Sequence, residues 1–85
     1  MTKRASMFEI VKIINDEPNT AWVIDTIEKE NDALSLARLY AEEHFTRVMV
    51  DNQSLRTTRY GAKFETNNGT PIHYTYRPSK GPDAL

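Results

Sequence analysis

Two histidines, His44 and His73, are the side chains best suited to acid–base chemistry in this 85-residue chain, and the sequence around each favours a structural role. His44 follows Glu42 and Glu43, but a zinc motif of this kind needs a second histidine one turn later, and none is present. At the end of a predicted helix, an imidazole can instead bond the last free carbonyl groups. His73 is predicted on the outward face of a strand, where contact with solvent or phosphate is favoured over general-base catalysis.

The remaining candidates for chemistry are carboxylates. Asp25 and Asp51 are predicted at strand ends beside the helix, where such groups usually accept hydrogen bonds from backbone donors. The chain has no cysteine, which excludes a disulfide framework, a thiolate nucleophile and a cysteine-based zinc site. Neither a metal site nor a cofactor site is predicted, and no small-molecule substrate is evident. We therefore expect a protein that is not an enzyme.

Basic residues gather in the second half of the chain. From Glu9 to Asp51 ten acidic side chains stand against four basic ones, whereas from Gln53 to Lys80 five basic side chains stand against Glu65 alone. Charge that is segregated in this way can steer a partner of opposite charge. The predicted basic face comprises Arg56, Arg59, Lys63, His73 and Arg77.

This basic face makes nucleic-acid binding the alternative function, because arginine and lysine on a sheet can contact phosphates and release counterions. Base stacking would require aromatic rings on the same face. The alternation instead directs Tyr60, Tyr74 and Tyr76 to the opposite, inward face. A pI near 6.1 is also low for a nucleic-acid-binding domain.

The elements that would position these residues form one domain over residues 7–77, with residues 1–6 as a flexible arm and 78–85 as a disordered tail. A helix is predicted from Glu30 or Asn31, with Asn31 as a plausible N-cap, to His44. Alternating apolar residues predict strands over 7–14, 21–27, 46–51, 56–66 and 71–77. The strand at 46–51 could lie parallel to the one before the helix through a right-handed crossover. Asn68-Gly69 predicts a hairpin between the last two strands.

The fold class is therefore α+β, with a single helix packed on a mainly antiparallel four- to five-stranded sheet in the order β-β-α-β-β-β. Ala33, Ala37 and Ala41 form the inward stripe of the helix and permit a close approach to the sheet. Leu36 widens this stripe, whereas Leu39 falls on the polar side. One helix covers only part of such a sheet, so the opposite face must be polar or covered by another subunit.

These features predict a small protein-interaction module that binds a protein partner stoichiometrically. Self-association as a homodimer is favoured because the core is small, the first strand is apolar on both faces, and Leu36 and Leu39 offer an interface. A scattered exposed leucine is the simpler explanation of Leu39. No apolar run is long enough to cross a bilayer, so no membrane partner is expected and a cytoplasmic location is the default.

Three alanines at four-residue spacing, followed by a valine-rich segment that includes Val48 and Val50, resemble one helix and one strand of the peptidoglycan-binding SPOR domain. The resemblance covers only those two elements. The chain lacks that family's second helix, so no functional residue is carried across.

Overall fold

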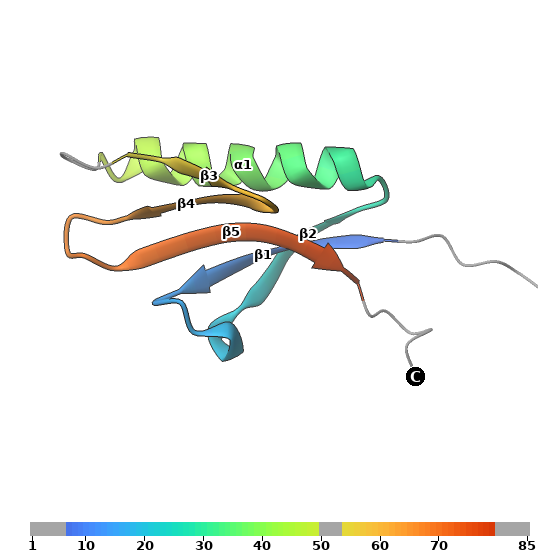
Figure 1. Ribbon diagram of the computed structural model, residues 1–85, viewed down its shortest axis with the longest axis horizontal. Coiled ribbons are helices and arrows are strands. Elements are labelled where there is room, and N and C mark those ends of the chain that lie inside the picture. Colours follow the sequence, from blue (N-terminus) through green and yellow to red (C-terminus); the bar gives the residue numbers. More distant parts are fainter. Residues whose placement is uncertain (1–6, 50–53, 80–85) are drawn as a thin grey trace, which may run out of the picture.

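The computed structural model describes residues 7–49 and 54–79, which form five strands and one α-helix. Figure 1 shows the helix lying along one face of the sheet. The α+β class and the predicted order β-β-α-β-β-β are confirmed. In chain order, the elements are β1 (Phe8–Ile14), the short 3-10 helix η1 (Pro18–Thr20), β2 (Trp22–Ile27), α1 (Glu30–Arg47), β3 (Arg56–Thr58), β4 (Gly61–Glu65) and β5 (Pro71–Pro78).

The sheet has the strand order β2-β1-β5-β4-β3, and every neighbouring pair is antiparallel. The last strand, β5, therefore lies at the centre and joins the β1–β2 hairpin to β4 and β3. The parallel crossover that the sequence allowed is wrong. Short β3 and the bulged β2 form the two edges of the sheet.

The strand predicted over residues 46–51 is wrong in its described part. Helix α1 continues beyond its predicted end to Arg47, and the chain then turns, with a positive φ of 50° at Met49. Phe45 explains the longer helix, because its ring packs edge-on against Phe64 with 5.4 Å between the ring centroids. This contact holds the last turn of the helix on the sheet. The rest of the predicted strand lies outside the described residues.

The single strand predicted over residues 56–66 is divided into β3 and β4. A turn at Arg59 and Tyr60 joins them. Because side-chain alternation does not continue through a turn, Tyr60 leaves the predicted inward face and is 46% exposed. Ala62 and Phe64, on the far side of the turn, are buried as predicted.

The start of α1 and the β4–β5 hairpin follow from local sequence. Helix α1 begins after Lys29, so Asn31 is not its N-cap, and no side chain caps the first turn. In the hairpin, Gly69 has a positive φ of 83°, and its N–H donates to the carbonyl of Thr66 at 2.8 Å. The predicted hairpin is confirmed, with the left-handed conformation at the glycine and not at Asn68.

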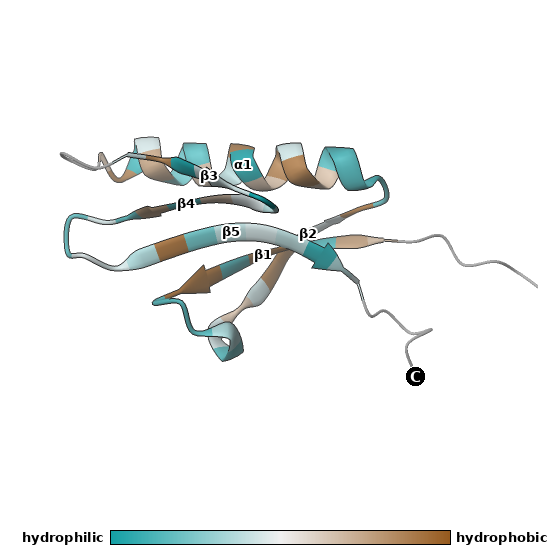
Figure 2. Cartoon of the chain, viewed as in Figure 1, coloured by the Kyte–Doolittle hydropathy of each residue, from teal (hydrophilic) through white to brown (hydrophobic). Residues whose placement is uncertain are grey.

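The core lies between α1 and the sheet. Ala33, Ala37 and Ala41 have no exposed surface, as the predicted stripe requires. Tyr74 and Tyr76 of β5 are buried beneath them, so their predicted inward orientation is confirmed. In Figure 2, hydrophilic residues predominate in the β4–β5 loop and at the start of α1.

No other described element covers the sheet face opposite α1. Val11 is nevertheless only 1% exposed, because it lies between its cross-strand neighbours Val23 and Thr75. The basic residues Lys63 and His73 occupy the other half of this face. It is therefore partly apolar and partly polar.

The two ends of the described domain lie side by side. Strand β5 extends to Pro78, and the N–H of Ser79 donates to the carbonyl of Met7 at 2.9 Å. Residues 1–6, predicted as an arm, and residues 80–85 of the predicted tail lie outside the described residues.

Gly61→Ala is expected to lower the free energy of unfolding by roughly 2–3 kcal/mol, because a Cβ atom there would overlap the backbone carbonyl of Tyr74 and lie 2.9 Å from Cα of Thr75. Gly69→Ala is the matched control. It meets no atom within 4 Å, and its cost of about 1 kcal/mol comes from the positive φ alone. Urea denaturation of the two variants measures both values, and equal destabilisation would contradict this account.

Candidate functional site

Tyrosine hydroxyl groups tie α1 to the sheet at two places. The hydroxyl of Tyr76 on β5 donates to Glu30 Oε2 at 2.8 Å, and that of Tyr40 on α1 donates to Asp25 Oδ2 at 2.8 Å. The bond to each carboxylate raises the pKa of the tyrosine. The other oxygen of Asp25 accepts from the N–H of Thr26 at 2.8 Å, which is the backbone role predicted for this carboxylate. These groups are engaged in fastening the fold.

His44 also connects the helix to β5. Its Nδ1 lies 2.7 Å from the hydroxyl of Tyr74, so it does not bond the helix-terminal carbonyls as the sequence suggested. Its ring packs edge-on against Phe64, with 5.2 Å between the centroids. Burial lowers the pKa of His44, and the nearby cations Lys12 and Arg47 lower it further. The neutral imidazole therefore serves as a packed hydrogen-bonding partner.

His73 lies on the open face of the sheet, as predicted. It is half-buried, and its Nε2 is 3.3 Å from Oγ1 of Thr58. Burial lowers the pKa of His73, and its cross-strand neighbour Lys63 acts in the same direction, whereas Asp16 opposes both. At neutral pH this side chain is therefore uncharged.

The fold brings three residues of the predicted basic face together. Arg56 pairs with Lys63 across β3 and β4, and Lys63 pairs with His73 across β4 and β5. The three side chains form a row on the face opposite α1. Since His73 is neutral at pH 7, the row carries two positive charges.

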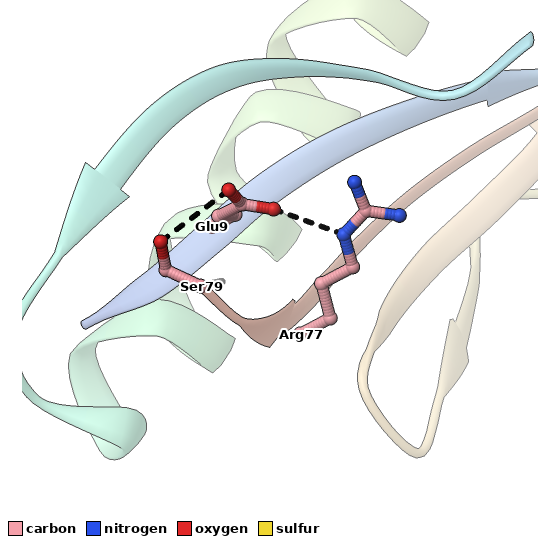
Figure 3. Close-up of polar contacts among 3 residues, drawn as sticks. All are labelled: Glu9, Arg77 and Ser79. Carbon is pink, nitrogen blue, oxygen red and sulfur yellow. Dashed lines mark hydrogen bonds and ion pairs between the residues drawn. The ribbon is translucent and has the colours of Figure 1, made fainter. Parts of the chain in front are cut away.

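The other two members of the predicted basic face lie elsewhere. Arg77 lies further along β5, and its Nε donates to Glu9 Oε1 at 3.0 Å, while Glu9 Oε2 accepts from Oγ of Ser79 at 3.4 Å (Figure 3). Arg59 stands in the β3–β4 turn, with its guanidinium carbon 5.5 Å from the ring centroid of Tyr60. The five basic residues thus do not form one surface.

Leu39 lines a groove between α1 and the β3 edge. The side chain is 47% exposed, and the groove has a volume of about 380 Å³. Leu36, its predicted companion, is half-buried and packs instead against the core around Ile10 and Tyr76. The predicted pair is therefore separated. The groove is lined by Ser35, Arg38, Leu39, Glu42, Leu55, Thr57 and Ala62.

Sequence reasoning missed the role of Arg38. Its Nε donates to the carbonyl of Gly61 at 3.0 Å, and its Nη2 donates to the carbonyl of Thr58 at 2.7 Å. The side chain thus clamps the β3–β4 turn to the helix and is only half-exposed. Its place opposite the alanine stripe predicts a solvated arginine, and no local signal in the sequence points to this turn.

Comparisons with protein-family models, curated proteins and solved structures find no match for this chain. Among the described residues, no group of three or more histidine, cysteine or acidic side chains is arranged to hold a metal ion. Within residues 7–49 and 54–79, no helix has both the length and the apolar character needed to cross a membrane. Function must therefore be argued from the surfaces themselves.

The free energy of unfolding is expected to decrease as the pH falls from about 7.5 to about 5.5. Both histidines have folded-state pKa values below the ordinary 6.5, so the unfolded chain binds protons first. The two histidines stabilise the folded state fully above pH 6.5. This stabilisation is lost as the pH falls through their folded-state pKa values. Urea denaturation across this pH range measures how steeply the free energy of unfolding changes with pH. His73→Gln should make this dependence shallower in part. An unchanged slope in His44→Gln and His73→Gln would contradict the prediction.

Proposed function

We propose that this domain is a non-enzymatic protein-binding module that captures an extended segment of a protein partner at the groove between α1 and β3. The groove itself is the observation that carries the proposal. Ala62 forms a buried apolar wall, and Leu39 and Leu55 add apolar surface that solvent reaches. A partner side chain inserted there would bury apolar area that is now exposed to water.

The position of the groove beside an edge strand supports this mode of binding. Strand β3 pairs only with β4 among the described elements, so its outer edge presents backbone groups without a sheet partner. An extended peptide can add to such an edge through main-chain hydrogen bonds, while alternate side chains enter a neighbouring pocket. The groove beside β3 supplies that pocket.

The groove is also held in shape before any partner arrives. Arg38 fixes the β3–β4 turn to the helix through its two bonds to backbone carbonyls. Less ordering is therefore required when a partner binds, which improves affinity. Arg38 and Glu42 place opposite charges on the helix side of the groove and favour a polar sequence around the partner's apolar anchor.

Self-association is the simplest form of this activity, with a second copy as the partner. The domain has a small core, and the exposed Leu39 would be covered in a symmetric contact. Sedimentation velocity at micromolar and millimolar concentrations tests this form directly. A monomer throughout would leave binding of another protein as the function.

Leu39→Arg is expected to weaken binding at least about tenfold, the equivalent of about 1.4 kcal/mol, because it places a charge in the apolar groove. Peptides selected from a random displayed library against the unmodified domain provide the ligand, and calorimetry measures each dissociation constant. Amide shifts on peptide addition should map to α1 and β3. For a self-associating chain, the same variant should shift the sedimenting species to the monomer.

Trp22→Arg is the matched control. Trp22 is also 47% exposed, but it lies on β2 at the other edge of the sheet. This variant should bind as tightly as the unmodified domain. Loss of binding in Trp22→Arg with retention in Leu39→Arg would place the interface on β2 and reject the groove.

Nucleic-acid binding is the second candidate, and the row Arg56–Lys63–His73 is the observation that favours it. Two cations and a histidine on an open sheet face can contact consecutive phosphates. The rings of Tyr74 and Tyr76 face the helix, so stacking on this face has no support. Any such binding would rest on the phosphate backbone and would be insensitive to sequence.

Neutralising Arg56 and Lys63 together should weaken binding to a mixed-sequence single strand at low salt. The slope of log affinity against log salt should become shallower by about 0.7 for each phosphate that the variant no longer neutralises. Arg59→Gln is the control, because it removes one positive charge away from the row. Fluorescence anisotropy measures these affinities, and no binding by the unmodified domain at low salt would dismiss this candidate.

A further inference from the structure

A second hollow lies where β5 ends and α1 begins. It has a volume of about 410 Å³ and is separate from the groove beside β3. Three aromatic rings from three different parts of the chain meet here, and we refer to the hollow as the aromatic notch. It is lined by Phe8, Glu30, Tyr60, Tyr76, Arg77 and Pro78.

The central ring of the notch stands nearly perpendicular to its two neighbours. Tyr76 lies at the centre, 5.8 Å from Phe8 with an interplanar angle of 79° and 5.5 Å from Tyr60 with an angle of 86°. Such an arrangement leaves angular recesses between ring edges and faces. A flat nucleobase needs a parallel slot or a bare ring face, whereas a puckered pyrrolidine ring fits a recess of this kind.

The ring faces are already occupied to a large extent. The Arg59 guanidinium lies over the Tyr60 ring at 5.5 Å, and Tyr76 is buried. A cage for a quaternary ammonium group would need open aromatic faces around the cation. The geometry therefore disfavours both a stacked base and a caged cation.

The polar groups that reach the notch from the helix side are the hydroxyls of Tyr60 and Tyr76 and the carboxylate of Glu30. Among the described residues, the hydroxyl of Tyr60 has no hydrogen-bond partner, whereas the guanidinium of Arg77 binds Glu9 on the sheet face opposite α1. Glu30 Oε2 accepts from the Tyr76 hydroxyl, which fixes the central ring in place. A polyproline II segment has no internal hydrogen bonds, so its carbonyl groups can accept from the Tyr60 hydroxyl.

We propose that the aromatic notch binds a proline-containing peptide segment in the polyproline II conformation, with a basic residue of that segment beside Glu30. Aromatic grooves recognise such segments because the ligand is extended before binding and loses little conformational entropy. The exposed Glu30, which opens α1, supplies a carboxylate for the basic flank. This site does not depend on the groove beside β3.

The test is an amide-shift titration of the full chain with a synthetic proline repeat that ends in arginine. Shifts should concentrate at Phe8, Glu30, Tyr60 and Tyr76, with a dissociation constant of about 0.1–1 mM, as suits a small site. A glycine–serine peptide with the same terminal arginine should bind at least about tenfold more weakly. Such a result separates recognition of proline from attraction of the basic residue.

Two variants of Tyr60 distinguish the contribution of ring packing to peptide binding from that of hydrogen bonding. Tyr60→Ala should weaken binding at least about tenfold, and Tyr60→Phe, which keeps the ring and removes the donor, by only a fewfold. The exposure of Tyr60 makes both variants compatible with folding, which circular dichroism checks. Leu39→Ala is the control and should bind the proline peptide normally.

Equal shifts from the glycine–serine peptide would overturn the proposal, as would unchanged binding by Tyr60→Ala. Tight binding of a proline-free peptide that carries trimethyl-lysine would overturn it in favour of a cation cage. Shifts centred on Leu39 would also reject it, because they would assign the proline segment to the groove beside β3. Failure at the notch leaves peptide binding at that groove intact.

Discussion

The close packing of α1 on the sheet depends on three alanines, Ala33, Ala37 and Ala41, none of which has exposed surface. A methyl group adds little thickness to the helix, so the helix axis lies near the strands. Long side chains on the central strand then extend past the stripe and reach polar groups on the helix. The hydroxyl groups of Tyr74 and Tyr76 meet the helix in this way. Larger residues in the stripe would separate both layers and break these bonds together.

The surfaces available for binding follow from the mismatch between one helix and five strands. Strands about 4.8 Å apart give a sheet about 19 Å wide between its outer axes, whereas a helix with its side chains is about 10–12 Å across. Helix α1 packs over β4, β5, β1 and β2 and leaves a margin beside β3. In that margin Leu39 is exposed and Leu55 is half-buried, and the aromatic notch lies at the end of the same interface. The groove and the aromatic notch both arise because α1 covers the sheet incompletely.

The fold could be predicted from the sequence wherever one hydrophobic periodicity extended along a whole helix or strand. The alternation of β5 predicted the buried tyrosines correctly, because that strand is paired on both sides and one face meets the helix. Prediction failed where tertiary contacts determine where an element ends or which way a side chain points. Phe45 extends α1 to Arg47 by packing on Phe64, and the turn after β3 moves Tyr60 outward. Leu39 could be recognised as an outlier from the helical period, but its groove could not, since Leu55 and Ala62 come from distant parts of the sequence.

Two of the groups that the sequence offers for acid–base chemistry are tied into the fold by hydrogen bonds. Among the acid–base candidates, His44 and Asp25 are each engaged by a tyrosine hydroxyl between the helix and the sheet, whereas His73 lies half-buried on the open face. A proton moved at His44 or Asp25 would disturb a bond that fastens the fold. The exposed groups are different in kind: Leu39 is apolar, and Arg56 and Lys63 are basic side chains paired across β3 and β4. These surfaces offer apolar area and basic side chains, which are the features that the proposed binding would use.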